Sequence, residues 1–126
     1  MSVEENKVEE NKAVIRAWLA ARHAHDVEAG VALWCADRQE WLRNAFNGFS
    51  QGFPDLRVTV TEIMGDGDFV AVWWTLHGTH HGLFRGIPAT GKAINWEVAD
   101  LYTMTNYQIA SLVRRAENLS ALLQQP

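Results

Sequence analysis

Two segments near the middle of the chain, 67–82 and 93–104, have the most strand-like pattern of apolar residues. Both are rich in Val, Trp, Thr and other side chains that suit a pleated, half-buried surface. The stretch between them, 83–92, contains two glycines and a proline, so we expect neither a strand nor a helix to run through it. The pattern predicts two long antiparallel strands joined by a wide loop, with one face of the pair forming the floor of a cavity.

Helical patterns precede these strands. The apolar residues within 14–19 recur at helical spacing and predict a first amphipathic helix that ends near His25. Residues 1–11 are charged, and we expect them to form a solvated, frayed lead-in. Asp26 is suited to cap a second helix that extends to Trp34.

A third helix is predicted to begin at Asp37, where Glu40 completes a capping-box pattern. Its apolar side chains fall in one stripe, made up of Trp41, Leu42, Ala45, Phe46 and Phe49. Pro54 ends the helix, because proline cannot continue a helix and restricts the residue before it.

Further strands flank the central pair. Alternating apolar and polar residues over 56–61 predict one strand, followed by a turn at 65–68. A last strand is expected from 109 to 115, after a turn at 105–108. The tail, 118–125, is expected to be a short helical or extended cover.

Helices followed by strands predict one α+β domain over residues 1–126, in which three N-terminal helices pack on a curved antiparallel sheet. Such a curved sheet leaves a pocket, the usual place for a small ligand. The net charge of -4 argues against nucleic acid as a partner. With a single cysteine and no apolar run of membrane-spanning length, we expect a cytoplasmic protein that binds no membrane. Six tryptophans favour an aromatic pocket or an aromatic interface.

Four motifs resemble the SnoaL-like polyketide cyclases in their order and spacing. They are Phe-Pro-Asp-Leu-Arg at 53–57, Gly-Asp-Phe-Val-Ala-Val at 67–72, Gly-Thr-His-His-Gly at 78–82 and Gly-Ile-Pro-Ala-Thr-Gly-Lys at 86–92. The resemblance covers roughly residues 12–125 and implies the cone-shaped α+β barrel of the nuclear transport factor 2-like superfamily. It also implies an intramolecular aldol condensation without metal or cofactor, in which a pocket carboxylate moves a proton next to a carbonyl.

The chain departs from this family at the residues that carry the chemistry. The resemblance places the acid/base aspartate of the cyclases at Arg114, which stays protonated and so cannot be the general base. It places a partner histidine at Asp100, so the carboxylate and the cation have changed places across two adjacent strands. The family also has a longer segment where this chain passes through 34–37. We therefore expect the pocket to be open on that side, or closed by another subunit.

Strand parity predicts which side chains share the pocket. If Asp100 faces inward, Trp96 and Tyr102 do so too. In this interpretation Asp100 is the acid/base and Arg114 is the electrostatic stabiliser. The residues expected to bind the ligand are Trp74, Trp96, Tyr102 and His80.

Each of these assignments has a structural alternative. Asp100 and Arg114 also fit a cross-strand ion pair that satisfies two buried charges. Trp74 and Trp96 also fit the core, because an indole buries a large area. The histidines within 77–81 have no convergent third ligand, so we expect no metal site.

The expected function is therefore the binding of a small, largely apolar, carbonyl-bearing molecule, with cofactor-free polyketide cyclisation or isomerisation as the reaction. In that reaction Asp100→Asn would abolish turnover and leave folding intact. A non-catalytic ligand-binding or dimerisation module is an alternative, favoured by Arg114 and the short 34–37 segment. Epoxide hydrolysis is a second alternative, but it needs another inward carboxylate, for which Glu97 and Glu117 are poorly placed.

Trp73 lies on the opposite strand face from Trp74 and would be exposed in a monomer. Together with Thr75 and His77 it predicts a homodimer through the sheet face, because aromatic residues are enriched at interfaces.

Overall fold

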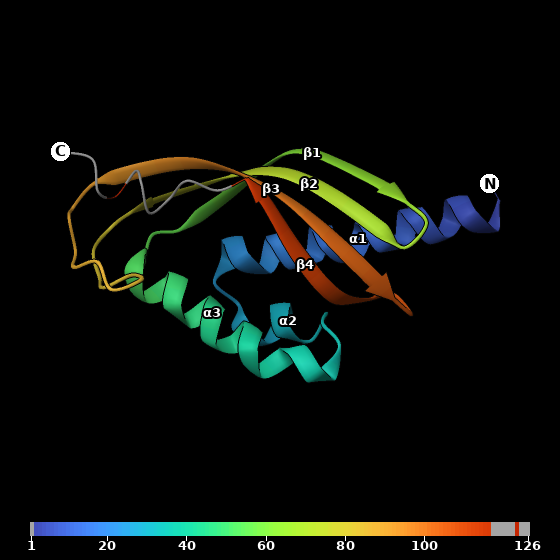
Figure 1. Ribbon diagram of the computed structural model, residues 1–126, viewed down its shortest axis with the longest axis horizontal. Coiled ribbons are helices and arrows are strands. Elements are labelled where there is room, and N and C mark those ends of the chain that lie inside the picture. Colours follow the sequence, from blue (N-terminus) through green and yellow to red (C-terminus); the bar gives the residue numbers. More distant parts are fainter. Residues whose placement is uncertain (1, 117–122, 124–126) are drawn as a thin grey trace.

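The computed structural model describes residues 2–116 and 123. Four antiparallel strands form one sheet in the order β1-β2-β3-β4. The strands are β1 (Arg57–Asp66), β2 (Phe69–Thr79), β3 (Ala93–Thr105) and β4 (Gln108–Ala116). The sheet arches over the helices, which lie on its concave face (Figure 1). The predicted α+β fold with a curved antiparallel sheet is confirmed.

Helix α1 (Val3–Ala24) begins earlier than the sequence analysis predicted. The Ser2 hydroxyl caps it by accepting a hydrogen bond from a backbone N–H of the first turn. Asn11 is buried and donates a hydrogen bond to the Gly67 carbonyl in the β1–β2 turn. Residues 3–11, which the sequence analysis expected to be a frayed lead-in, are thus helical, and the turn between two strands contacts this part of the helix.

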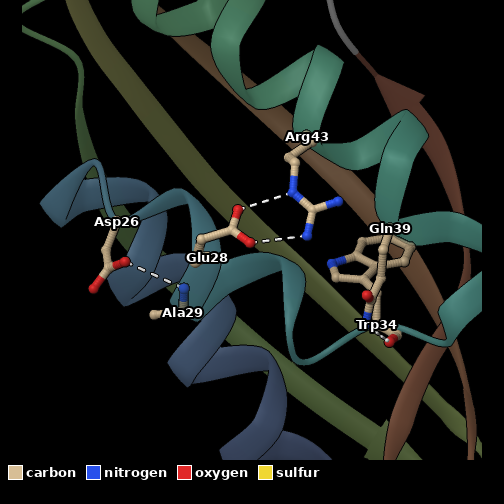
Figure 2. Close-up of polar contacts among 6 residues, drawn as sticks. All are labelled: Asp26, Glu28, Ala29, Trp34, Gln39 and Arg43. Carbon is tan, nitrogen blue, oxygen red and sulfur yellow. Dashed lines mark hydrogen bonds and ion pairs between the residues drawn. The ribbon is translucent and has the colours of Figure 1, made fainter.

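Helices α2 (Val27–Val31) and α3 (Gln39–Gly52) complete the helical layer. The Asp26 side chain caps α2, as predicted. Glu28 on α2 and Arg43 on α3 form a bidentate ion pair that joins the two helices (Figure 2). Nε and Nη2 of Arg43 each lie 2.8 Å from a carboxylate oxygen of Glu28.

The passage between these helices differs from the prediction. Trp34 lies outside α2 and instead forms an isolated parallel bridge with Ile109 of β4. A short 3-10 helix, η1 (Ala36–Arg38), precedes α3, and no side-chain cap hydrogen bond is present at either start. The predicted capping box of Asp37 and Glu40 is wrong, because backbone hydrogen bonds of this tight turn, and no side-chain cap, precede α3.

The central pair of strands, β2 and β3, has the predicted arrangement. Trp96, Asp100 and Tyr102 are buried on the inner face of β3, whereas Glu97 is exposed. Trp74 is buried on β2 and its neighbour Trp73 is 49% exposed on the outer face.

The outer strands are less regular. A bulge between Val60 and Glu62 shifts the register of β1, so the predicted alternation holds only before it. The turn before β4 places Asn106 and Tyr107 at positive φ, as a tight two-residue hairpin requires. The predicted cover over 118–125 lies outside the described residues, except for Leu123, which is buried.

Two groups of aromatic rings fill much of the space under the sheet. In one, Trp18 meets Trp34 and Phe46 edge-on, with ring centroids 5.4 and 5.9 Å apart. In the other, Phe53 meets Trp96 and His80, at 5.1 and 5.4 Å. No helix in the described part of the chain is long and apolar enough to cross a membrane.

Candidate ligand-binding site

Asp100 is the centre of a buried polar network. Its carboxylate accepts hydrogen bonds from the Trp74 indole N–H at 2.9 Å and the Tyr102 hydroxyl at 3.1 Å. Arg114 donates from Nε and Nη2, at 2.9 and 3.3 Å. Asp100 and Arg114 are register partners on β3 and β4, so the predicted cross-strand ion pair is confirmed.

This network keeps Tyr102 as a hydrogen-bond donor. Burial raises the pKa of its hydroxyl far above the usual value, and the nearby Asp100 carboxylate raises it further. The hydroxyl is therefore protonated at neutral pH. The Arg114 guanidinium lies 5.7 Å from the ring centroid of Trp74 and is held in place by its bonds to Asp100.

A pocket of about 400 Å³ lies beside this network, between α1, α3 and the inner face of β3 and β4. Its size is within the range of small-molecule sites. Trp41 lines the pocket, is 57% exposed and follows the short connection between α2 and α3. The lining residues are mostly apolar, and they are Trp18, Arg22, Trp41, Leu42, Ala45, Phe49, Phe84, Arg85, Tyr102, Leu112 and Arg114.

The structure brings two of the predicted site residues to this pocket. Arg114 and Tyr102 line it, whereas Asp100 lies behind them with a side chain that is 0% exposed. Trp74 does not line the pocket, but it bonds to Asp100 and its ring lies near the Arg22 and Arg114 guanidiniums. Trp96 and His80 are not brought to the pocket, because both pack on Phe53 in the core.

His80 has a clear structural role in the loop between β2 and β3. Its Nδ1 accepts a hydrogen bond from the Thr90 N–H at 3.2 Å, and its backbone pairs with Gly91 and Lys92. His77 instead lies on the outer face and bonds to Asn95 at 2.7 Å. These side chains diverge, and no group of three potential metal ligands occurs in the described part of the chain.

Arg22 on α1 is a site residue that the sequence analysis missed. Its guanidinium lies between 4.8 and 5.8 Å from the ring centroids of Trp18, Phe46, Phe49 and Trp74. Its Nε and Nη2 are buried, and neither has a hydrogen-bond partner among the described residues. The signal was available, because Arg22 is four residues after Trp18 and so falls on the same face of the helix.

Burial, with a smaller contribution from the neighbouring Arg114 cation, lowers the pKa of Arg22 to about 10. At neutral pH the Arg22 guanidinium is therefore charged, and the side chain of Arg114 is a cation as arginine is in general. The pocket thus offers cationic donors against an aromatic wall, an arrangement that can hold and polarise an oxygen-bearing apolar molecule. No acidic residue is among the described residues that line it. Glu97 is exposed, and Glu117 lies outside the described part of the chain.

Comparison with known proteins gives one family. The family model for SnoaL-like polyketide cyclases matches residues 12–126. A search of the curated proteins finds no match.

Several solved structures have the same fold. TsrD from Streptomyces laurentii is 19% identical, with a TM-score of 0.83 over 92% of this chain and 94% of that one. A proposed SnoaL-like polyketide cyclase from Jannaschia sp. CCS1 is 20% identical, with a TM-score of 0.80 over 100% of this chain and 98% of that one. AclR from Streptomyces galilaeus, a proposed hydroxylase, is 24% identical, with a TM-score of 0.79 over 92% of this chain and 82% of that one.

Proposed function

The chain belongs to the SnoaL-like polyketide cyclase family, and on that premise we propose that it binds a small, largely apolar, carbonyl-bearing molecule in the pocket between α1, α3 and the sheet. The observation that carries this proposal is the pocket itself, which combines apolar and aromatic walls with the guanidinium of Arg114. A few polar groups in an apolar pocket fix the orientation of a ligand.

Arg114 is the group that contacts the carbonyl oxygen in this proposal. A guanidinium carries five N–H donors in one plane, and the two bonds to Asp100 fix the direction of that plane. Tyr102 donates its only hydroxyl proton to Asp100, so it contributes its ring as a wall. Asp100 acts here as a positioning residue.

Isothermal titration calorimetry with 2-acetylnaphthalene, a flat apolar ketone, tests this function. We expect binding to the unmodified protein and no binding to Ala45→Phe, because the larger side chain fills the pocket. Asn47→Phe is the matched control, since Asn47 is exposed on the same helix and does not line the pocket. No binding to the unmodified protein, or equal binding to both variants, would overturn the proposal.

Proton transfer next to the carbonyl, as in aldol cyclisation or isomerisation, is a second candidate function. What favours it is that both predicted site residues lining the pocket, Arg114 and Tyr102, bond directly to Asp100. In this reaction the Asp100 carboxylate, which lies behind Arg114 and Tyr102 in the structure, would have to reach the carbon beside the carbonyl to take its proton, and Arg114 would stabilise the enolate oxygen.

Exchange of the acetyl protons of 2-acetylnaphthalene in D₂O separates the two candidates. A cyclase or isomerase would accelerate this exchange, followed by proton NMR, and Asp100→Asn would abolish the acceleration. Binding of the ketone without accelerated exchange would rule out the proton-transfer function and leave the non-catalytic binding module.

A further inference from the structure

The charges in the pocket do not balance within the described residues. Three arginines line it, Arg22, Arg85 and Arg114, and no acidic residue does. Arg85 is exposed, and Arg114 is paired with Asp100. Arg22 therefore adds one buried positive charge, in a chain whose net charge is -4.

The N–H groups of Arg22 make this charge unusual. Nε and Nη2 are both buried without a partner, and Arg22 is the only charged side chain with such atoms in the described part of the chain. Buried donors normally have acceptors, and a charged donor without one is especially unfavourable. Arg22 also lines the pocket, so a molecule bound there lies against the residue that carries these donors.

The aromatic rings around Arg22 stabilise its buried charge but do not replace hydrogen-bond acceptors for its N–H groups. A ring face attracts the cation as a whole, and the four surrounding rings do so from 4.8 to 5.8 Å. A ring face is nevertheless a weak acceptor compared with an oxygen atom. One of these rings, Trp74, also lies 5.7 Å from the Arg114 guanidinium, so the two cations flank a common ring.

We infer that the ligand is a singly charged anion, a largely apolar molecule whose carboxylate binds the guanidinium of Arg22. The planar fork of a guanidinium matches the two oxygens of a carboxylate. One carboxylate also neutralises the excess charge, because Arg114 is already balanced by Asp100. This inference rests on the proposed function and narrows its substrate class to apolar acids that also carry a carbonyl group.

Calorimetric titration with 2-naphthoate and 2-naphthamide tests the inference. The two probes share a ring system and a shape, and they differ in the charge of one group. We expect the unmodified protein to bind 2-naphthoate about tenfold to a hundredfold more tightly than 2-naphthamide, because hydrogen bonds to charged groups are stronger than those between neutral groups. In Arg22→Met this preference should disappear, because Met keeps the apolar stem and removes the donors. Arg16→Met, an exposed position on α1, should retain it.

The comparison of the two probes in the unmodified protein decides the question even if Arg22→Met does not fold. Arg22→Lys is then the second variant, and its naphthoate preference should be weaker because it keeps the charge and loses the fork. Equal affinity for the two probes, or a preference unchanged in the Arg22 variants, would overturn the inference. If 2-acetylnaphthalene still binds, the proposed function survives that result. If none of the three compounds binds, the proposed function itself fails.

Discussion

Asp100 accepts hydrogen bonds on both carboxylate oxygens, and this determines what a substitution there does. In Asp100→Asn an amide N–H₂ faces the guanidinium of Arg114, and this partly buried cation loses its counter-charge. We expect the free energy of unfolding to fall by about 3 kcal/mol, because breaking a buried pair from one side leaves an uncompensated charge. Urea denaturation followed by circular dichroism measures this change.

The matched control is Glu97→Gln on the same strand. Glu97 is exposed on the outer face, so the same carboxylate-to-amide change should alter stability by less than about 0.5 kcal/mol. Equal effects at the two positions would contradict the role of Asp100 in stability. We therefore expect Asp100→Asn to destabilise the fold, in contrast to the sequence-based expectation that folding stays intact. A proton-exchange assay with this variant must be accompanied by a check that the variant is folded.

Strand parity predicted that Trp96 and Tyr102 share a face with Asp100, because a strand alternates its side chains with a fixed period, and the family resemblance implied that this face is the inner one. The same reasoning could not show that Trp96 packs on Phe53 away from the pocket, since that depends on how far α3 and the loop cover the sheet. Arg22 was missed for a different reason. Charge usually marks the solvated face of an amphipathic helix, whereas the spacing of Arg22 from Trp18 places it inside.

At the scale of elements, the loop between β2 and β3 is tied to the end of α3. The backbone N–H groups of His81 and Gly82 donate to the Gly52 carbonyl, at 3.0 and 3.2 Å. A Cβ atom on Gly82 would overlap the Gln51 carbonyl oxygen. We expect Gly82→Ala to lower the free energy of unfolding by about 2 kcal/mol, because two backbone segments would have to move apart. Thermal and urea denaturation measure the loss.

Gly48→Ala is the contrasting substitution. Gly48 lies within α3, and a Cβ atom there has nothing within 4 Å. Alanine should stabilise the protein by about 0.5–1 kcal/mol, since it restricts the unfolded chain and favours the helix. A destabilising effect at Gly48, or a neutral one at Gly82, would contradict this account of the loop.

The elements that the sequence predicted poorly are those fixed by distant contacts. The early part of α1 packs against the end of β1 and the turn after it, and Gly65 of β1 lets Val8 and Lys12 approach closely. The parallel bridge of Trp34 to Ile109 joins residues far apart in the chain, and no local pattern encodes it. The Asp26 cap and the turn at 105–108 were predicted well, because their hydrogen bonds and dihedral angles are local. The capping box of Asp37 and Glu40 was predicted wrongly although it is local too.

At the scale of the whole molecule, the outer face of the sheet carries a row of apolar side chains. Met64, Ala71, Leu101 and Val113 are register partners across the four strands, and Phe69 and Trp73 extend the row on either side along β2. Met64, Phe69 and Trp73 are each about half exposed, between 49% and 52%. We propose that a second copy of the chain covers this face, as the predicted homodimer requires, because a two-fold axis pairs a patch with itself.

Trp73→Glu should then convert a dimer into a monomer, because two like charges would meet in an apolar interface. Sedimentation equilibrium over a range of concentrations measures the change. Leu83→Glu, at an exposed apolar residue in the β2–β3 loop, should leave the dimer intact. A monomeric unmodified protein, or identical behaviour of the two variants, would refute the proposed dimer.

The position of Trp41 gives the protein a built-in optical signal. Trp18, Trp34, Trp74 and Trp96 are buried and Trp73 is half exposed on the outer face of the sheet, whereas Trp41 is exposed and lines the pocket. A molecule that enters the pocket therefore displaces water from this indole and should shift its fluorescence to shorter wavelengths. Ligands can thus be screened without a dye or label, and Trp41→Phe identifies the part of the emission that reports entry.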